Sequence, residues 1–303
     1  MDIIRPVAIT HSVLVNSSIT DDEYPVYSNA TSYTQGSRVI VLAGASGENI
    51  SVVYEAMTTT QGNFPPTHAS GETPIWLRLG ASNRWRMFDD FTSTYSEATD
   101  TLEVVFRTPD VANAISLYGV TAETLTLTIT DDVEGVVFSE EINLISSENI
   151  LDIYDYFFEE PENRKDLVIN IPPYSDADIT LTLTAPGTIR VGKVLLGMRK
   201  SLGSTQYRTR VGIRDFSRKD IDEFGNPRFM RRRTSKLVNF VVLIETKRIS
   251  EIQNILAEYT TTPMTWIGSD SAEETIVYGF YKDFDIILSS NELSDCSIQV
   301  EGL

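Results

Sequence analysis

Alternation of apolar and polar residues dominates this chain. Leu or Ile alternates with Thr in residues 125–130 and 179–184, and residues 102–106 carry a related pattern. A period of two, with one apolar and one polar face, is typical of half-buried antiparallel strands. Turn-forming residues at 134–135 and 185–187 separate such segments. The pattern therefore predicts a mainly β fold.

One segment has a helical period instead. Residues 245–259 carry apolar side chains three or four positions apart: Ile249, Ile252, Ile255, Leu256 and Tyr259. This spacing places them on one face of an amphipathic helix. The sequence 260–263, which closes with a proline, predicts the end of that helix. A shorter helix or turn is expected within 146–158.

The last residues of the sequence alternate again. In 292–303, one face carries Cys296, Ile298 and Val300, whereas Leu293 falls on the other face. Residues 278–288 are the expected antiparallel partner, because the polar stretch 289–292 can connect the two strands. We expect the 245–259 helix to cover their apolar face and the chain to be ordered to Leu303. Cys296 is then a small buried apolar side chain rather than a reactive thiol.

Composition divides the chain into three segments. Residues 1–88 are rich in Ser, Thr, Gly and aromatics, and residues 89–200 hold the cleanest Thr/Leu strands. Residues 201–303 hold most of the clustered basic residues and the helical pattern. The predicted architecture is a small β module at 1–88, an antiparallel β-sandwich at 89–200 and an α+β domain at 201–303.

Charge is unevenly distributed. The chain has 43 Asp and Glu against 25 Lys and Arg, a net charge of −18, which argues against nucleic acid as a partner. Residues 201–303 carry a net charge of −2, which leaves −16 for residues 1–200. Within 208–236, ten basic and four acidic residues give +6. This basic segment could dock on an acidic face of a neighbouring subunit. The alternative is a solvated surface that blunts edge strands.

Arg84 and Trp85 are candidate subunit-interface positions, because arginine and aromatic residues are enriched at protein–protein hot spots. The basic segment adds the candidates Arg228, Arg231, Arg232, Arg233 and Lys236. The mixture at 83–85 and 278–284 suits a seam between domains of one chain equally well.

Enzymatic chemistry has little support in the sequence. Adjacent acidic pairs such as Asp89-Asp90 point to opposite faces of a strand or lie in turns, so they do not form a catalytic pair. The sequence has no Gly-x-Ser-x-Gly, phosphate-binding loop, His-Glu-x-x-His or EF-hand motif. The single Cys296 excludes an intrachain disulfide and a cysteine-built zinc site. We expect no catalytic residues, no cofactor and no metal.

Membrane and export signals are also missing from the sequence. It contains no run of 18 apolar residues, and its first residues lack the apolar core of a signal peptide. We therefore expect no membrane insertion, and synthesis in a reducing cytoplasm.

The N-terminal aromatics carry a family resemblance. Tyr27, then Tyr33-Thr-Gln-Gly36-Ser-Arg-Val39, Tyr54-Glu-Ala56 and Trp76 resemble the chitin-binding-type carbohydrate-binding modules, with Tyr27 where the family usually has Trp. The resemblance implies that Tyr27, Tyr33, Tyr54 and Trp76 stack on sugar rings. The alternative is that Tyr33, Tyr54 and Trp76 form the core of a small module.

A second resemblance covers nearly the whole chain. Residues 75–90, from Ile-Trp-Leu-Arg to Met-Phe-Asp-Asp, are similar to a segment of tailed-bacteriophage virion proteins, and further matching stretches are 154–158, 212–219, 222–226, 266–268, 278–284 and 296–303. This resemblance implies a non-enzymatic structural subunit of the phage tail, near the baseplate or tail tip, that links the tail core to peripheral proteins. Its partners would be other tail proteins and copies of itself. It would be made in the bacterial host cytoplasm and reside in the virion. The alternative function is a carbohydrate- or receptor-binding virion protein that contacts a host-surface glycan.

Overall fold

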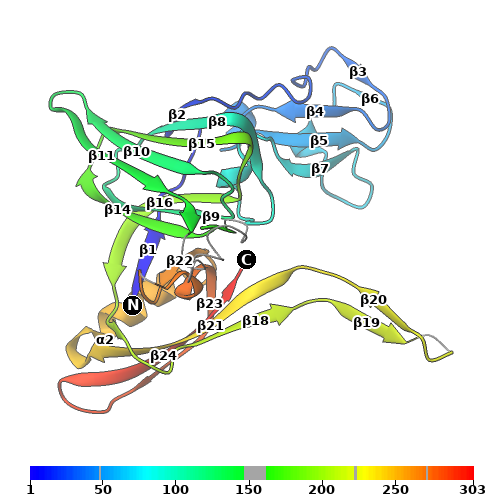
Figure 1. Ribbon diagram of the computed structural model, residues 1–303. Helices are drawn as coiled ribbons and strands as arrows, with labels where there is room; N and C mark the ends of the chain where they lie inside the picture. Colours follow the sequence, from blue (N-terminus) through cyan, green and yellow to red (C-terminus); the bar gives the residue numbers. More distant parts are fainter. Residues whose placement is uncertain (48, 147–161, 222–223, 271) are drawn as a thin grey trace, which may run out of the picture. The chain divides into compact units, whose positions relative to one another are not determined.

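The computed structural model describes residues 1–47, 49–146, 162–221, 224–270 and 272–303 (Figure 1). Of the described residues, 54% lie in strands and 9% in helices, which confirms the mainly β prediction. The chain forms two compact units. Unit 1 combines Met1–Pro6 with Gly197–Leu303, and unit 2 is Val7–Leu196.

Unit 1 is built on one antiparallel sheet. In spatial order its strands are β16 (Lys193–Ser201, from Gly197 onward), β1 (Asp2–Pro6), β22 (Met264–Ile267), β23 (Ile276–Ile287), β24 (Leu293–Gly302), β21 (Thr234–Glu245) and β17 (Ser204–Thr205), and β18 (Arg210–Asp215) also pairs with β21. A short 3-10 turn, η5 (Glu273–Thr275), precedes β23.

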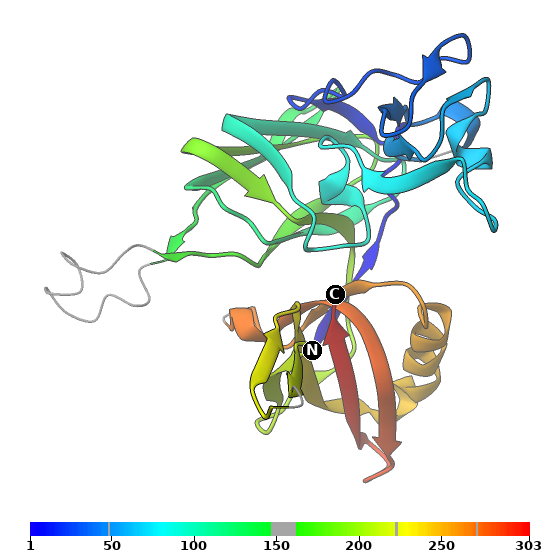
Figure 2. The ribbon, with the colours of Figure 1, turned by 90° about the vertical axis from the view of Figure 1, so that its right-hand side faces the viewer.

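Helix α2 (Ile249–Glu258) covers one face of this sheet (Figure 2). Its side chains Ile252, Ile255 and Leu256 are buried in a core with Phe240 and Trp266. The predicted helix is confirmed. It begins at Ile249 because Thr246–Arg248 form a 3-10 turn, η4.

The C-terminal strand follows the predicted pattern. Cys296, Ile298 and Val300 are buried, whereas Leu293 is 41% exposed. Strand β24 pairs with β23 as expected, and its other edge pairs with β21, so the strand is central. The Leu303 N–H donates to the Tyr278 carbonyl at 3.0 Å. Burial, helped by a nearby carboxylate, raises the pKa of the Cys296 thiol to about 11, in keeping with an inert side chain.

An arm extends from the sheet of unit 1 (Figure 1). Strand β18 is followed by β19 (Arg218–Ile221), which pairs with β20 (Pro227–Met230) before the chain returns into β21. Between the two ladders, the Phe216 N–H donates to the Arg233 carbonyl at 3.3 Å, and the Arg232 N–H donates to the Ser217 hydroxyl at 3.0 Å. We call residues 210–234 the arm.

Unit 2 contains two sheets around one apolar core. The first has the order β11 (Gly135–Asn143), β10 (Thr124–Asp131), β15 (Asp178–Val191), β8 (Ser96–Arg107) and β2 (Leu14–Ser17), and the second contains β14 (Leu167–Tyr174), β9 (Ala112–Tyr118) and the first residues of β16. Leu, Ile, Val and Phe side chains from both sheets share the core, while Thr126 and Thr182 form a cross-strand pair on the half-exposed face. The predicted sandwich is thus present.

A smaller aromatic module belongs to the same unit. Its strands are β4 (Arg38–Val41), β5 (Val52–Ala56) and β7 (Trp76–Ala81) in one sheet and the pair β3 (Ser32–Tyr33) and β6 (Thr60–Gln61), with 3-10 turns η1 (Ala45–Gly47), η2 (Pro65–Thr67) and η3 (Arg86–Phe88). The short pair β12 (Ile145–Ser146) and β13 (Glu162–Asn163) completes the described elements of unit 2.

The division into units differs from the three composition segments. Strand β1 pairs with β16 and β22 in unit 1, and β2 pairs with β8 in the sandwich. The strands of segment 1–88 therefore belong to four different sheets. A strand pairs with whichever edge satisfies its backbone hydrogen bonds, even when that edge is far away in the sequence. Ser146 ends β12, and the rest of the helix or turn expected at 146–158 lies outside the described residues.

Candidate subunit-contact site

Apolar side chains stand exposed along the arm. Ile213 is 77%, Phe229 69% and Phe224 88% exposed, and every residue of β18 and β20 is exposed. The sequence interpretation counted the charges of this segment but overlooked these apolar residues. Their signal was present in residues 210–214, where Val211 and Ile213 alternate with Arg210, Gly212 and Arg214. An isolated two-stranded ribbon is only marginally stable in water, and clustered exposed apolar groups mark interaction surfaces.

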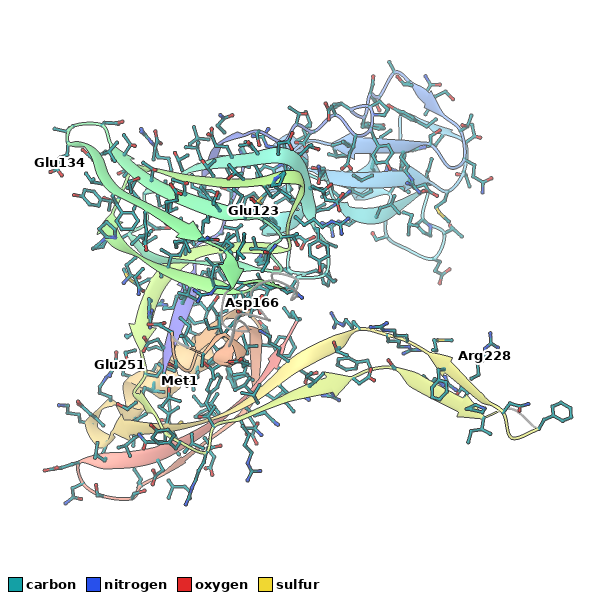
Figure 3. The ribbon with its side chains drawn as sticks, viewed as in Figure 1. Met1, Glu123, Glu134, Asp166, Arg228 and Glu251 are labelled. Carbon is teal, nitrogen blue, oxygen red and sulfur yellow. The ribbon has the colours of Figure 1, made fainter. Side chains whose placement is uncertain are left out.

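The predicted basic residues lie on the same arm. Arg228, Arg231, Arg232 and Arg233 are exposed, and Figure 3 shows Arg228 on the outer part of the arm. Lys236 lies at its root, where it is half-buried and its ammonium group is 3.4 Å from the Ile276 carbonyl. The structure therefore brings four of these five residues together on one exposed element.

Cation–π contacts brace the middle of the arm. The guanidinium groups of Arg214 and Arg233 lie 5.1 and 5.8 Å from the centre of the Phe216 ring. Such contacts contribute about 0.5–1 kcal/mol each at exposed sites. The Ser217 hydroxyl and backbone N–H, and more weakly Arg231, hold the pKa of Asp215 below its usual range.

A buried carboxylate anchors the root of the arm to the sheet. Glu301 of β24 accepts from Arg214 at 2.9 Å and from Lys282 at 2.7 Å. The hydrogen bond from Lys282, together with the charges of Lys282 and Arg214, lowers the pKa of Glu301. This contact ties β18 to β23 and β24, so the first residues of the arm have a fixed direction.

The two remaining interface candidates lie elsewhere. Trp85 is only 3% exposed and packs edge-on against Phe88 at 5.9 Å within the sandwich core of unit 2. Arg84 is half-buried beside it. The assignment of Trp85 to a subunit interface is therefore wrong, because its ring is already enclosed by its own unit. Of the two interpretations offered for this aromatic stretch, packing within one chain holds for Trp85.

The proposed sugar platform is mostly buried. Tyr33, Tyr54 and Trp76 belong to the core of the aromatic module, and the Trp76 indole N–H donates to the Asn63 carbonyl at 2.9 Å. These three rings cannot stack on a sugar, since a module of this size needs them as its core. Tyr27 is half-buried and stacks on Tyr33 at 5.6 Å, so one candidate of the four retains an accessible surface.

Within the described residues, His, Cys, Asp and Glu form no group of three or more that could hold a metal ion. No helix in this part of the chain is both long and apolar enough to span a membrane. Comparison with family models, curated proteins and solved structures gave no match.

Proposed function

We propose that this protein is a non-enzymatic structural subunit of a bacteriophage tail, placed near the baseplate or tail tip, that assembles with its neighbours through the arm. The arm supports the assembly role in this proposal. It combines exposed apolar side chains, an arginine cluster and a braced root on a ribbon too thin to have its own core.

The two kinds of side chain have separate roles in such a contact. Ile213, Phe224 and Phe229 supply apolar area, and burial of a Phe or Ile side chain contributes about 1.5–3 kcal/mol. Arg231, Arg232 and Arg233 steer the arm toward an acidic surface and make the association salt-sensitive.

A second copy of the chain offers a complementary surface. Residues 1–200 carry a net charge of −16 against +6 for residues 208–236. Glu140 and Glu141 are exposed on β11, an edge strand of the unit 2 sheet. Contact of one copy's arm with the acidic unit of the next would repeat from subunit to subunit, as a tail assembly requires. The phage assignment itself rests on the resemblance of residues 75–90 and the further stretches to tail proteins.

The test replaces Arg231, Arg232 and Arg233 together by Glu, with a matched variant in which all three become Lys. We expect the Glu variant to lose incorporation into phage particles, measured by mass spectrometry of purified virions. Its association in sedimentation velocity should also weaken at least tenfold, whereas the Lys variant retains most of both. All six substitutions lie on exposed positions, so unchanged melting temperatures serve as the folding control.

Two results would overturn the proposal. Wild-type incorporation of the Glu variant would show that the arm does not make the contact. Absence of the wild-type chain from purified virions would remove the phage-tail assignment, whatever the arm does.

A further inference from the structure

A pocket with a mixed polar and apolar lining lies on the face of the unit 1 sheet opposite helix α2. Its volume is about 440 Å³, and Val241 and Phe284 line it together with the polar residues Arg208, Arg210, Asn239, Asp283, Asp285, Ser297 and Gln299. Asn239 alternates with the buried Val238 and Phe240 on β21, which fixes it on the open face. This volume falls within the range of pockets that bind small molecules.

Strand register assembles the lining from four strands. Arg210 of β18 pairs with Asn239 of β21, Asn239 with Gln299 of β24, and Gln299 with Asp283 of β23. The four side chains form one row across the sheet, from a cation at one end through two amides to an anion at the other. In the neighbouring row, Ser297 pairs with Val241 on one side and with Asp285 on the other. Arg208 also lines the pocket.

A β-bulge creates the anionic end of these rows. The register of β23 against β24 shifts between Tyr281 and Asp283. As a result, Tyr281, Phe284 and Ile286 pack on the core of unit 1, while Asp283 and Asp285 are exposed on the other face. Continued alternation from Tyr281 would have turned Asp283 toward the core and Phe284 outward. Bulges recur beside functional sites because they re-aim side chains.

The middle of the row holds an unsatisfied acceptor. Within the described part of the chain, no hydrogen-bond donor reaches the enclosed Oδ1 atom of Asn239. A buried polar atom without a partner costs about 1–3 kcal/mol. A ligand that reorganises the Arg210 and Gln299 side chains around this amide can relieve that cost.

The chemistry of the lining selects a class of ligand. Arg208 and Arg210 balance Asp283 and Asp285, so the pocket as a whole carries no net charge that would select a simple anion or cation. Three interstrand spacings separate the cationic end from the anionic end, about 14 Å. A free amino acid is too short to use both ends, because its charged groups are about 3 Å apart.

Vicinal hydroxyl groups fit this lining better. Each hydroxyl donates and accepts, and carboxylate, amide and guanidinium groups present paired acceptors and donors in a plane. We propose that this pocket binds a neutral saccharide. The site differs from the aromatic module to which the sequence resemblance pointed, and it goes beyond the assembly role proposed for the arm.

The experiment uses the full chain and saturation-transfer difference NMR. The probes are methyl α-D-glucopyranoside, methyl β-D-galactopyranoside, N-acetyl-D-glucosamine and maltose, with tetraglycine as a zwitterion long enough to reach both ends. We expect transfer to at least one saccharide, with a Kd of about 1 mM for a monosaccharide, and none to tetraglycine. The Asp283→Ala and Gln299→Ala variants should each weaken binding at least tenfold.

Two variants serve as matched controls. Asp295→Ala removes an exposed carboxylate from the same strand as Gln299 but outside the pocket, and Tyr27→Ala removes the accessible ring of the aromatic module. Both should bind like the wild type. The inference fails if no saccharide on the panel binds, or if tetraglycine binds instead. It also fails if saccharide binding survives both pocket variants, or if Tyr27→Ala abolishes saccharide binding.

Discussion

Truncation after Asp295 tests how unit 1 is held together. The deletion removes residues 296–303, which form most of β24 and pair with β21 on one side and β23 on the other. It also removes the carboxylate of Glu301, which anchors Arg214 and Lys282. Strands β21 and β23, which both hydrogen-bond to β24, would then lack their shared partner over the deleted residues.

The magnitude follows from burial. Ile298 and Val300 are at most 1% exposed, and burying each such side chain contributes about 1.5–3 kcal/mol. The two together account for about 3–6 kcal/mol before Cys296 or the lost strand pairing is considered. A typical domain is stable by about 5–15 kcal/mol in total. We therefore expect the truncated chain to lose the cooperative folding of unit 1.

Differential scanning calorimetry combined with limited proteolysis measures this effect. We expect one transition to disappear and new cleavages to fall within residues 197–295, while the strands of unit 2 stay protected. Two substitutions in β24 calibrate the result. Ile298→Ala should cost about 2–5 kcal/mol, whereas Leu293→Ala, at an exposed position of the same strand, should cost less than about 1 kcal/mol.

A truncated protein with the wild-type melting profile would refute this reasoning. So would equal costs for Ile298→Ala and Leu293→Ala. Either result would mean that the core of unit 1 is complete without β24, and that the strand is a separable arm.

Two further predictions concern single side chains. Trp76→Ala should destabilise the aromatic module by about 3–5 kcal/mol, the usual range for a core Trp, and a smaller loss in urea denaturation would show that the indole is not part of a packed core. Glu301→Gln should make the protein less sensitive to acid. Since its pKa is lowered in the folded chain, mainly by Lys282, this carboxylate stabilises the fold above its unfolded pKa and loses that contribution as the pH falls through the folded value. Between pH 6 and pH 3 the wild type should therefore lose more stability than Glu301→Gln, and parallel pH profiles would contradict the assignment.

Periodicity alone predicted much of the local structure. The alternation in 292–303 identified the buried set Cys296, Ile298 and Val300, and the spacing in 245–259 identified helix α2 with its core residues. These predictions succeed because side-chain direction in a strand or helix is fixed by the backbone repeat, which the sequence displays directly.

Aromatic residues were harder to interpret from sequence. Trp76 and Trp85 both occur in a stretch that resembles known modules, and both are buried. A sequence cannot distinguish a ring that stacks on a ligand from one that fills a core, because both uses favour the same large flat side chains. Only the packing of Trp85 against Phe88 excluded the interface assignment.

Long-range pairing was decided by the tertiary structure. Nothing local to Asp2–Pro6 indicates that this strand pairs with β16 and β22, about 200 or more residues away. The row from Arg210 to Asp283 likewise depends on three registers and one bulge. The sequence by itself determined which faces of its strands are apolar. The order of the strands, and therefore which polar side chains meet on the open face, depended on backbone hydrogen bonds between segments far apart in the chain.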